Sequence, residues 1–195
     1  LPPGAARAPF PTARAGAVAS RDVIASFMWA VLLFAGVVGF GRAAATEKEE
    51  GRIEGLVLAP VDPASLFVGK SVAGFIYLTV VELIVVPASI VFFDIDASSL
   101  LPRLLPVLGL ANAGMAFAGT LFSTASQYAR VREMVLPLLL FPVVLPVVLA
   151  ATKLTGSLLA SGNFSGGMRW FILMAAFDLA IGAVGAVTFE YVIRE

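Results

Sequence analysis

The stretch VIASFMWAVLLFAGVVGFGRAAA, residues 23–45, carries a single charged side chain, that of Arg42. A helix rises about 1.5 Å per residue, so this length is enough to cross the hydrocarbon core of a bilayer, which is about 30 Å thick. Backbone groups in lipid must form their hydrogen bonds internally, which excludes an isolated strand. The stretch therefore predicts a transmembrane helix.

Four more apolar segments follow and predict four further membrane-spanning helices. Hydrophobic residues make up 59% of the 195 residues and charged residues 13%, whereas soluble domains have about 45–50% and about 25%. We expect Pro87 to interrupt the second helix in its outer part. The predicted fold class is all-α, a polytopic transmembrane helix bundle with five spans at about 23–45, 64–93, 100–124, 131–152 and 168–193.

The composition excludes several classes of function. The chain has no Cys and no His, so it lacks thiolate metal ligands and the residue most often used as a general base. Its formal net charge is zero, which gives no reason to expect a nucleic acid partner. A membrane enzyme would need clustered polar groups, but the two deep acids, Glu82 and Asp178, lie on different predicted spans. We therefore predict that the chain is not itself an enzyme and holds no metal.

Basic side chains orient the predicted spans. Loop 42–58 carries three basic residues, and loop 125–133 carries Arg130 and Arg132. The positive-inside rule places both loops and the C-terminus in the cytoplasm. Residues 1–22, which hold three arginines, are then outside. We expect this segment to be an external connection that follows a missing first span; a disordered tail is the alternative.

The most charged stretch is EKEEGRIEGLVLAP, residues 47–60, and it predicts a short amphipathic cytoplasmic helix over 46–59. Its acidic side chains recur at spacings of three and four, so they share one face. Two glycines four residues apart let another surface approach closely, and a proline ends the helix. A solvated loop is the alternative. The residues that define the pattern are Glu47, Glu50, Gly51, Glu54, Gly55, Leu56 and Pro60.

Four polar side chains are predicted to lie within the spans. Lys70 lies near a cytoplasmic end, where its side chain is expected to snorkel to the interface. Glu82 is about 18 Å deeper along a helix, where insertion scales assign a charged group a cost of about 2.5–3.5 kcal/mol. Glu82 and Asp178 each fit a structural hydrogen bond or a functional role. Asn112 either bonds across helices or serves packing.

Prolines and small residues shape two of the predicted spans. Pro137, Pro142 and Pro146 are expected to bend the fourth span. That helix then either lines a gate or forms an irregular packing element. The run of Gly and Ala at 109–119 predicts close helix packing in the third span.

Three stretches together resemble one protein family. The first is LFAGVVGFGRAAATEKEEGRIEGLVLAPVDPASLFVGKSVAGFIYL, which resembles the haem exporter protein B (CcmB) family of cytochrome c maturation permeases. The basic loop with the Pro-rich span, STASQYARVREMVLPLLLFPVVLPVVLAAT, and the end, FDLAIGAVGAVTFEYVIRE, are similar to the same family. The resemblance covers about residues 24–195. The positions that fit the family pattern are Glu47, Glu50, Gly51, Glu54, Leu56, Pro60 and Lys70.

The resemblance implies a six-span permease subunit of the ABC-2 type in the bacterial inner membrane, of which five spans are seen here. It implies a separate ATPase subunit as a partner. The sequence itself has no G-x-x-x-x-G-K-[ST] phosphate loop, so if ATP drives the complex, another polypeptide must bind it. The predicted helix at 46–59 would then dock on the ATPase and transmit its closure. Other cytochrome c maturation membrane proteins, a second copy of the chain and membrane lipid are the further implied partners.

The resemblance makes haem a candidate substrate, but the residues offer no strong axial ligand. Without His or Cys, only Met or Tyr could bind the iron, and Met115, Met134 and Met174 are predicted core residues. No cofactor is therefore predicted on this chain, and ATP is expected on the partner. Two alternatives remain open: an ABC-2 permease for another amphiphile, such as a lipid or drug, and a membrane scaffold without transport.

Overall fold

The computed structural model describes residues 11–49, 62–126, 132–164 and 166–194. This described part of the chain contains five α-helices and no strand, and each helix includes a segment long and apolar enough to cross a membrane. The predicted all-α class with five spans is therefore confirmed, and the chain is a multi-pass membrane protein. The helices are α1 (Pro11–Glu49), α3 (Pro63–Phe92), α4 (Ala97–Ser126), α5 (Arg132–Ser161) and α6 (Met168–Arg194).

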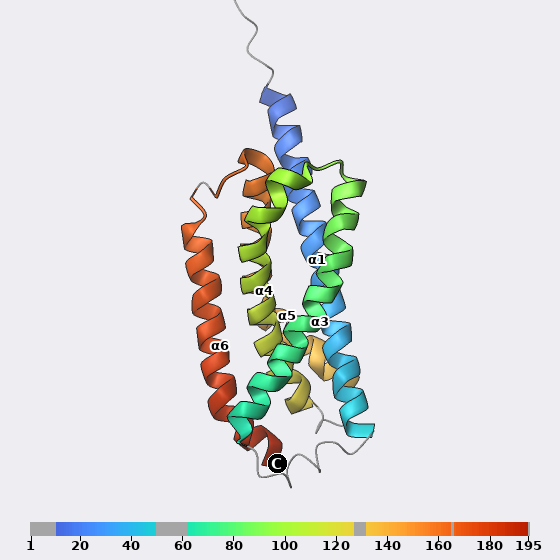
Figure 1. Cartoon of the computed structure of the whole chain (residues 1–195), viewed down its shortest axis with the longest axis vertical. Helices are drawn as coiled ribbons and strands as arrows, with labels where there is room; N and C mark the ends of the chain where they lie inside the picture. The colour runs from blue at the N-terminus through green and yellow to red at the C-terminus, as the bar shows by residue number, and fades with distance from the viewer. Residues whose placement is uncertain (1–10, 50–61, 127–131, 165, 195) are drawn as a thin grey trace, which may run out of the picture.

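The helices form an up-and-down bundle with α4 at its centre (Figure 1). Successive described helices run in opposite directions, so the C-terminal ends of α1, α4 and α6 and the N-terminal ends of α3 and α5 lie at one end of the molecule. The central helix α4 contacts each of the other four. The most apolar stretch of its span is 61% buried inside the bundle, whereas the corresponding stretch of α6 is 11% buried. The helix α6 therefore lies at the edge of the bundle.

Aspartates lie at both ends of α3 and at the start of α4. Asp62 caps the start of α3, because its carboxylate accepts a hydrogen bond from the backbone N–H of Ser65 at 3.1 Å. At the other end of α3, Asp94 turns the chain with a positive φ of 49°, a conformation that Asp tolerates better than most residues. Asp96 then accepts a hydrogen bond from the N–H of Ser98 at 3.1 Å at the start of α4. The tight turn fixes the antiparallel pairing of the two helices.

Two helices are longer than the sequence predicts. α1 begins at Pro11, inside the segment 1–22 that is predicted to be an external connection or tail. α5 continues to Ser161, beyond the predicted end of its span at 152. Leu154 and Leu158 lie four residues apart and are both buried, so an amphipathic helical period continues through a stretch whose Lys, Thr, Gly and Ser residues otherwise suggest a loop.

Prolines lie inside α3 and α5 without ending either helix. α3 continues through Pro87 to Phe92, so the predicted interruption there is wrong. α5 contains Pro137, Pro142 and Pro146 and remains one helix. Each proline removes one N–H donor, and the remaining hydrogen bonds carry the helix past it. Neighbouring helices make such prolines tolerable inside a membrane.

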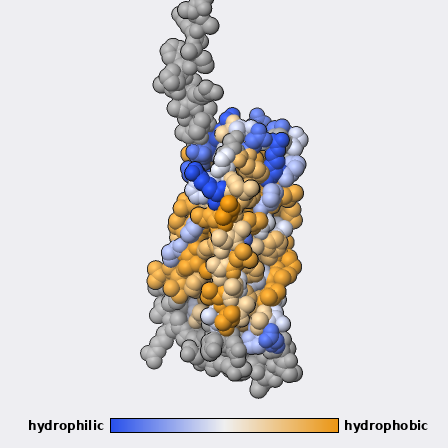
Figure 2. Space-filling view, turned by 90° about the vertical axis from the view of Figure 1, so that its left-hand side faces the viewer, coloured by the Kyte–Doolittle hydropathy of each residue, from blue (hydrophilic) through white to orange (hydrophobic). Residues whose placement is uncertain are grey.

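The outer surface of the bundle is apolar at mid-height. On the face drawn in Figure 2, hydrophobic residues form a band, and hydrophilic residues gather toward its ends. Leu83, Leu138 and Leu179, from three different helices, are between 71% and 75% exposed. An apolar surface of this extent is unusual for a soluble monomer and is the surface that lipid contact requires.

Candidate functional site

The residues that are predicted to contact a partner lie, where the structure describes them, at one end of the bundle. This is the end at which α1 ends and α3 begins. Glu47 lies near the end of α1, and Arg132 is the first residue of α5. The prediction of a separate helix that starts at residue 46 is wrong for residues 46–49, because these residues continue α1. The other predicted residues lie outside the described residues: Glu50, Gly51, Glu54, Gly55, Leu56, Pro60 and Arg130.

An ion pair joins α1 to α3 at this end. The ammonium group of Lys70 lies 2.5 Å from Oε2 of Glu47, and the two side chains are 21% and 22% exposed. Lys70, which the sequence predicts to snorkel toward the interface, is therefore held by a carboxylate of the neighbouring helix. Glu47 belongs by spacing to the predicted acidic face, but the structure turns it toward α3. The pair therefore fixes the distance between α1 and α3, the two helices that precede and follow the segment 50–61.

A double-mutant cycle checks the Glu47–Lys70 contact. We expect Glu47→Gln and Lys70→Gln to be non-additive, with a coupling energy of roughly 0.5–1 kcal/mol for a partly exposed pair. The free energy of unfolding in detergent micelles measures it. Glu47→Gln combined with Lys153→Gln, on the far part of α5, is the matched control and should be additive. A coupling energy of zero for Glu47 and Lys70 would contradict the contact.

A cavity of about 220 Å³ opens beside this ion pair, between α1, α3 and α4. Tyr77 closes one side, since its hydroxyl donates a hydrogen bond to the carbonyl of Ala35 at 3.0 Å. The ring of Phe40 forms part of the apolar wall. The cavity thus has a charged rim and an apolar interior. The lining residues are Phe40, Ala43, Glu47, Lys70, Ala73, Gly74, Tyr77, Thr120 and Ser123.

Phe40 holds α1, α3 and α4 together through two glycines. A Cβ atom added at Gly74 of α3 would lie 2.7 Å from Cε1 of Phe40, and one added at Gly119 of α4 would lie 2.4 Å from Cε2. Real Cβ atoms do not approach so closely, so the ring fits only because both helices lack a side chain there. The close packing predicted for the run 109–119 of α4 takes this form at Gly119.

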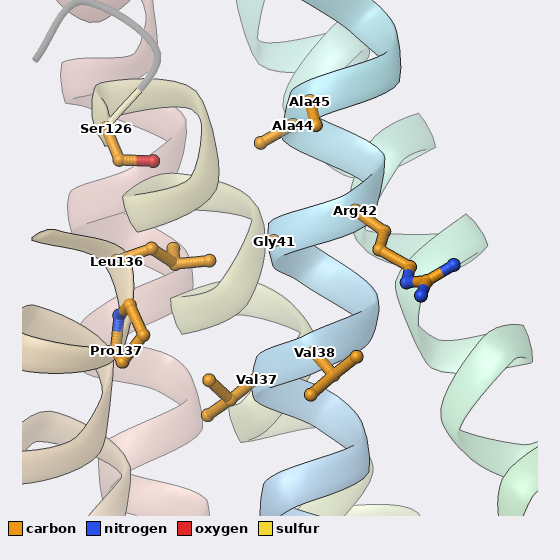
Figure 3. A pocket seen from close by; sticks show the side chains of 9 residues that line it. All are labelled: Val37, Val38, Gly41, Arg42, Ala44, Ala45, Ser126, Leu136 and Pro137. Carbon is orange, nitrogen blue, oxygen red and sulfur yellow. The ribbon is translucent and has the colours of Figure 1, made fainter. Parts of the chain in front are cut away.

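A second cavity, of about 430 Å³, lies between α1 and the adjoining ends of α4 and α5 (Figure 3). Val37 and Leu136 point into the space between α1 and α5, whereas the side chain of Arg42 points away from Leu136 toward another helix. The interior is therefore largely apolar. The lining residues are Val37, Val38, Gly41, Arg42, Ala44, Ala45, Ser126, Leu136 and Pro137.

The structure brings two of the predicted intramembrane residues together. The amide Nδ2 of Asn112 on α4 donates hydrogen bonds to Oε2 of Glu82 at 2.9 Å and to the hydroxyl of Thr79 at 3.4 Å, both on α3. Glu82 is 6% exposed and Asn112 is 1% exposed. Thr79 was not predicted from the sequence. Its position three residues before Glu82 places it on the same helical face, and this spacing is the signal that could have identified it.

Asp178 lies on the other side of α4 from this group. Its Oδ1 atom would lie 2.4 Å from a Cβ atom at Gly114, so the carboxyl group of α6 packs directly on the backbone of α4. Gly114 and Asn112 are two residues apart, which turns them about 200° from each other around the helix. Glu82 and Asp178 are therefore separated by α4 and do not form a paired-acid site.

The described residues contain no group of three His, Cys, Asp or Glu side chains arranged to hold a metal ion. Met115 and Met174 are buried in the hydrophobic core, as predicted.

A comparison with protein families matches nearly the whole chain. A family model described as CcmB protein matches residues 14–194. No curated protein and no solved structure matches the chain. The family match covers α3, α4, α5 and α6 completely and α1 from residue 14, and it includes the ion pair and the buried polar group.

Proposed function

The chain belongs to the CcmB protein family, and on this premise we propose that it is the permease subunit of an ABC transporter complex that delivers or exports haem for c-type cytochrome biogenesis. The family match and the five apolar helices support this role. The proposed complex includes a separate ATPase subunit, other cytochrome c maturation membrane proteins and a second copy of this chain. It lies in a bacterial inner membrane, with the C-terminus of this chain in the cytoplasm.

The sequence supports an ATPase on another polypeptide. A phosphate loop has the pattern G-x-x-x-x-G-K-[ST] and precedes a helix. Gly69, Lys70 and Ser71 match only the end of that pattern, because position 64 is alanine. These residues lie within α3, and Lys70 binds Glu47 instead of being free for a phosphate. If ATP drives the complex, its binding groups belong to the partner.

The observation that carries the coupling mechanism is the contact between Glu47 and Lys70. It joins α1, which precedes the segment 50–61, to α3, which follows it. We propose this segment as the ATPase contact. A partner that displaces this segment then moves both helices together, and Phe40 extends the movement to α4. The carboxylates of Glu50 and Glu54 would set register and association rate against basic side chains of the ATPase.

Charge reversal in the segment tests this proposal. We expect Glu50→Lys combined with Glu54→Lys to lower the amount of co-purified ATPase subunit by more than about tenfold, since each new lysine would face a basic partner surface and a tenfold change needs only about 1.4 kcal/mol. Affinity purification of this chain from its own cells, with quantitative mass spectrometry of the ATPase, gives the measurement.

Asp94→Lys, at the opposite end of the bundle, is the matched control for a reversed acid and should retain the ATPase. Equal recovery of the ATPase with wild type and with the doubly reversed chain would refute the coupling role of 50–61. The haem role has a separate test, because a strain lacking this chain should lose covalent c-type cytochromes whichever surface binds the ATPase.

A permease for another amphiphile is the second candidate function. The observation that favours it is the largely apolar cavity of about 430 Å³ between α1 and α5, which suits an acyl chain as well as a porphyrin. The chain also has no His or Cys with which to bind haem iron. Normal covalent c-type cytochromes in the deletion strain would favour this candidate.

A further inference from the structure

The group Thr79–Glu82–Asn112 lies deep in the membrane-spanning part of the bundle. Asn112 is near the middle of the apolar span Leu100–Ser126, and Glu82 is well inside the span Pro63–Phe92. The group is closed off by packing, since both Glu82 and Asn112 are more than nine-tenths buried. It is not part of either cavity described above.

Two acceptor atoms of this group have no hydrogen-bond partner. They are Oε1 of Glu82 and Oδ1 of Asn112. The amide Nδ2 supplies the hydrogen bond at 2.9 Å to the other carboxyl oxygen of Glu82. The hydroxyl of Thr79 supplies no proton here, because it donates to the carbonyl of Phe75 at 2.9 Å. The group therefore holds more acceptors than donors, in a place where an unpaired polar atom is costly.

The basic side chains described on α3 and α4 lie away from Glu82. On α3 itself, Lys70 is twelve residues away, about 18 Å along the helix, and is paired with Glu47. On α4, Arg103 is nine residues from Asn112, about 13 Å, and bonds the carbonyl of Gly162. Lys153 of α5 is exposed, and α5 does not contact α3. The charged side chains described on α1 and α6 are Arg21, Asp22, Arg42, Glu47, Arg169 and Asp178.

The charges of α1 and α6 do not neutralise Glu82 either. Leu78 of α3 packs at Gly36 of α1, which sets Glu82 about one turn beyond that level and about three turns from both Arg21 and Arg42. On α6, Asp178 is the charged residue nearest in depth, and it is an acid on the far side of α4. An ionised Glu82 would thus have one neutral amide donor and no ion pair with another described residue.

We propose that Glu82 and Asn112 form a proton-binding site inside the membrane. Glu82 carries the proton, taken from water, as a neutral carboxylic acid. With the Asn112 amide turned by 180°, that O–H donates to Oδ1 of Asn112 across the contact that now measures 2.9 Å. One proton thus removes the charge of Glu82 and supplies one hydrogen-bond donor to the pair. Release of the proton would leave a bare carboxylate between α3 and α4, so release requires water to reach the pair.

Infrared spectroscopy of the chain reconstituted in lipid vesicles tests the site. We expect wild-type protein at neutral pH to show a carbonyl band of a protonated carboxylic acid that is lost in Glu82→Gln and shifted in Asn112→Leu. Asp178→Asn is the matched control, because it removes a different buried carboxyl group and should leave the Glu82 band in place. A spectrum in which Glu82→Gln removes only carboxylate bands would overturn the proposal.

A pH profile separates proton binding from a merely structural hydrogen bond. We expect the folded fraction of wild type in micelles to fall as pH is raised, and Glu82→Gln to make that fall smaller, since glutamine has no proton to lose and only the other buried carboxyl group, Asp178, still ionises. Asp178→Asn removes that second group, so the difference between Asp178→Asn and the double variant Glu82→Gln with Asp178→Asn isolates the contribution of Glu82. Parallel profiles for wild type and Glu82→Gln, or a folded fraction of wild type that rises with added sodium or potassium ions, would overturn the proton site.

Discussion

Replacing Phe40 with alanine is expected to lower the free energy of unfolding by about 3–5 kcal/mol, the range for removal of a buried aromatic ring. Phe40 is 6% exposed, and its ring occupies the space left by Gly74 and Gly119. Removing it opens a void shared by three helices, which none of the three can close alone. Equilibrium unfolding of the purified chain in mixed micelles measures the loss.

The same contact predicts that alanine substitutions at two glycines of α4 change the free energy of unfolding in opposite directions. Gly119→Ala should be destabilising by about 1–3 kcal/mol, because the new Cβ collides with the Phe40 ring. Gly109→Ala is the matched control: nothing lies within 4 Å of its added Cβ, so helix propensity should make it stabilising by up to about 1 kcal/mol. In the Phe40→Ala background, Gly119→Ala should become harmless. Additive effects of Phe40→Ala and Gly119→Ala would contradict the contact.

Trp29→Ala is expected to have an effect of similar size, about 3–5 kcal/mol. Trp29 is fully buried, and its indole N–H donates to the hydroxyl of Thr155 at 2.9 Å, which ties α1 to α5. The hydroxyl in turn donates to the carbonyl of Ala151 at 2.8 Å. Both packing and a hydrogen bond are lost together. Unfolding monitored by circular dichroism avoids dependence on the fluorescence of the deleted tryptophan.

Thr155→Val separates the hydrogen bond from the packing of Trp29. It should destabilise the bundle by about 1–3 kcal/mol, because the indole N–H is left buried without an acceptor. Thr188→Val on α6 is the matched control, since that hydroxyl bonds only the carbonyl of Val184 in its own helix, and it should change stability by less than about 0.5 kcal/mol. Equal effects of the two valine substitutions would mean that the α1–α5 hydrogen bond contributes nothing.

The sequence determines which segments cross the membrane but not how each helix is rotated about its axis. The five spans follow from apolar length, because the bilayer excludes other backbone structures. The pairing of Glu82 with Asn112 depends on which faces of α3 and α4 meet, and uniformly apolar helices give no periodic signal of that. The spacing predicts that Glu47 shares one acidic face with Glu50 and Glu54 of a separate helix, but α1 continues to Glu49 and brings Glu47 to Lys70.

Helix ends were predicted less well than helix centres for a related reason. The end of α5 contains polar residues and Gly156, and only the buried partners of Leu154 and Leu158 keep it helical. Phe40 could not be recognised as a packing centre, because it became one only when Gly74 and Gly119 were brought to it from other helices. Aromatic and glycine residues in separate spans are too common for their positions alone to predict such a contact.

The position of Phe40 between two glycines also limits how the molecule can change shape. A shift of α4 by one residue, about 1.5 Å along its axis with a turn of about 100°, would bring the side chain of Ala118 or Thr120 against the ring in place of Gly119. Sliding of α4 past α1 at this level would therefore cost a steric clash, and the packing favours movement of α1, α3 and α4 together. A displacement of α1 beside Glu47 would then be shared by α3, through Lys70, and by α4, through Phe40.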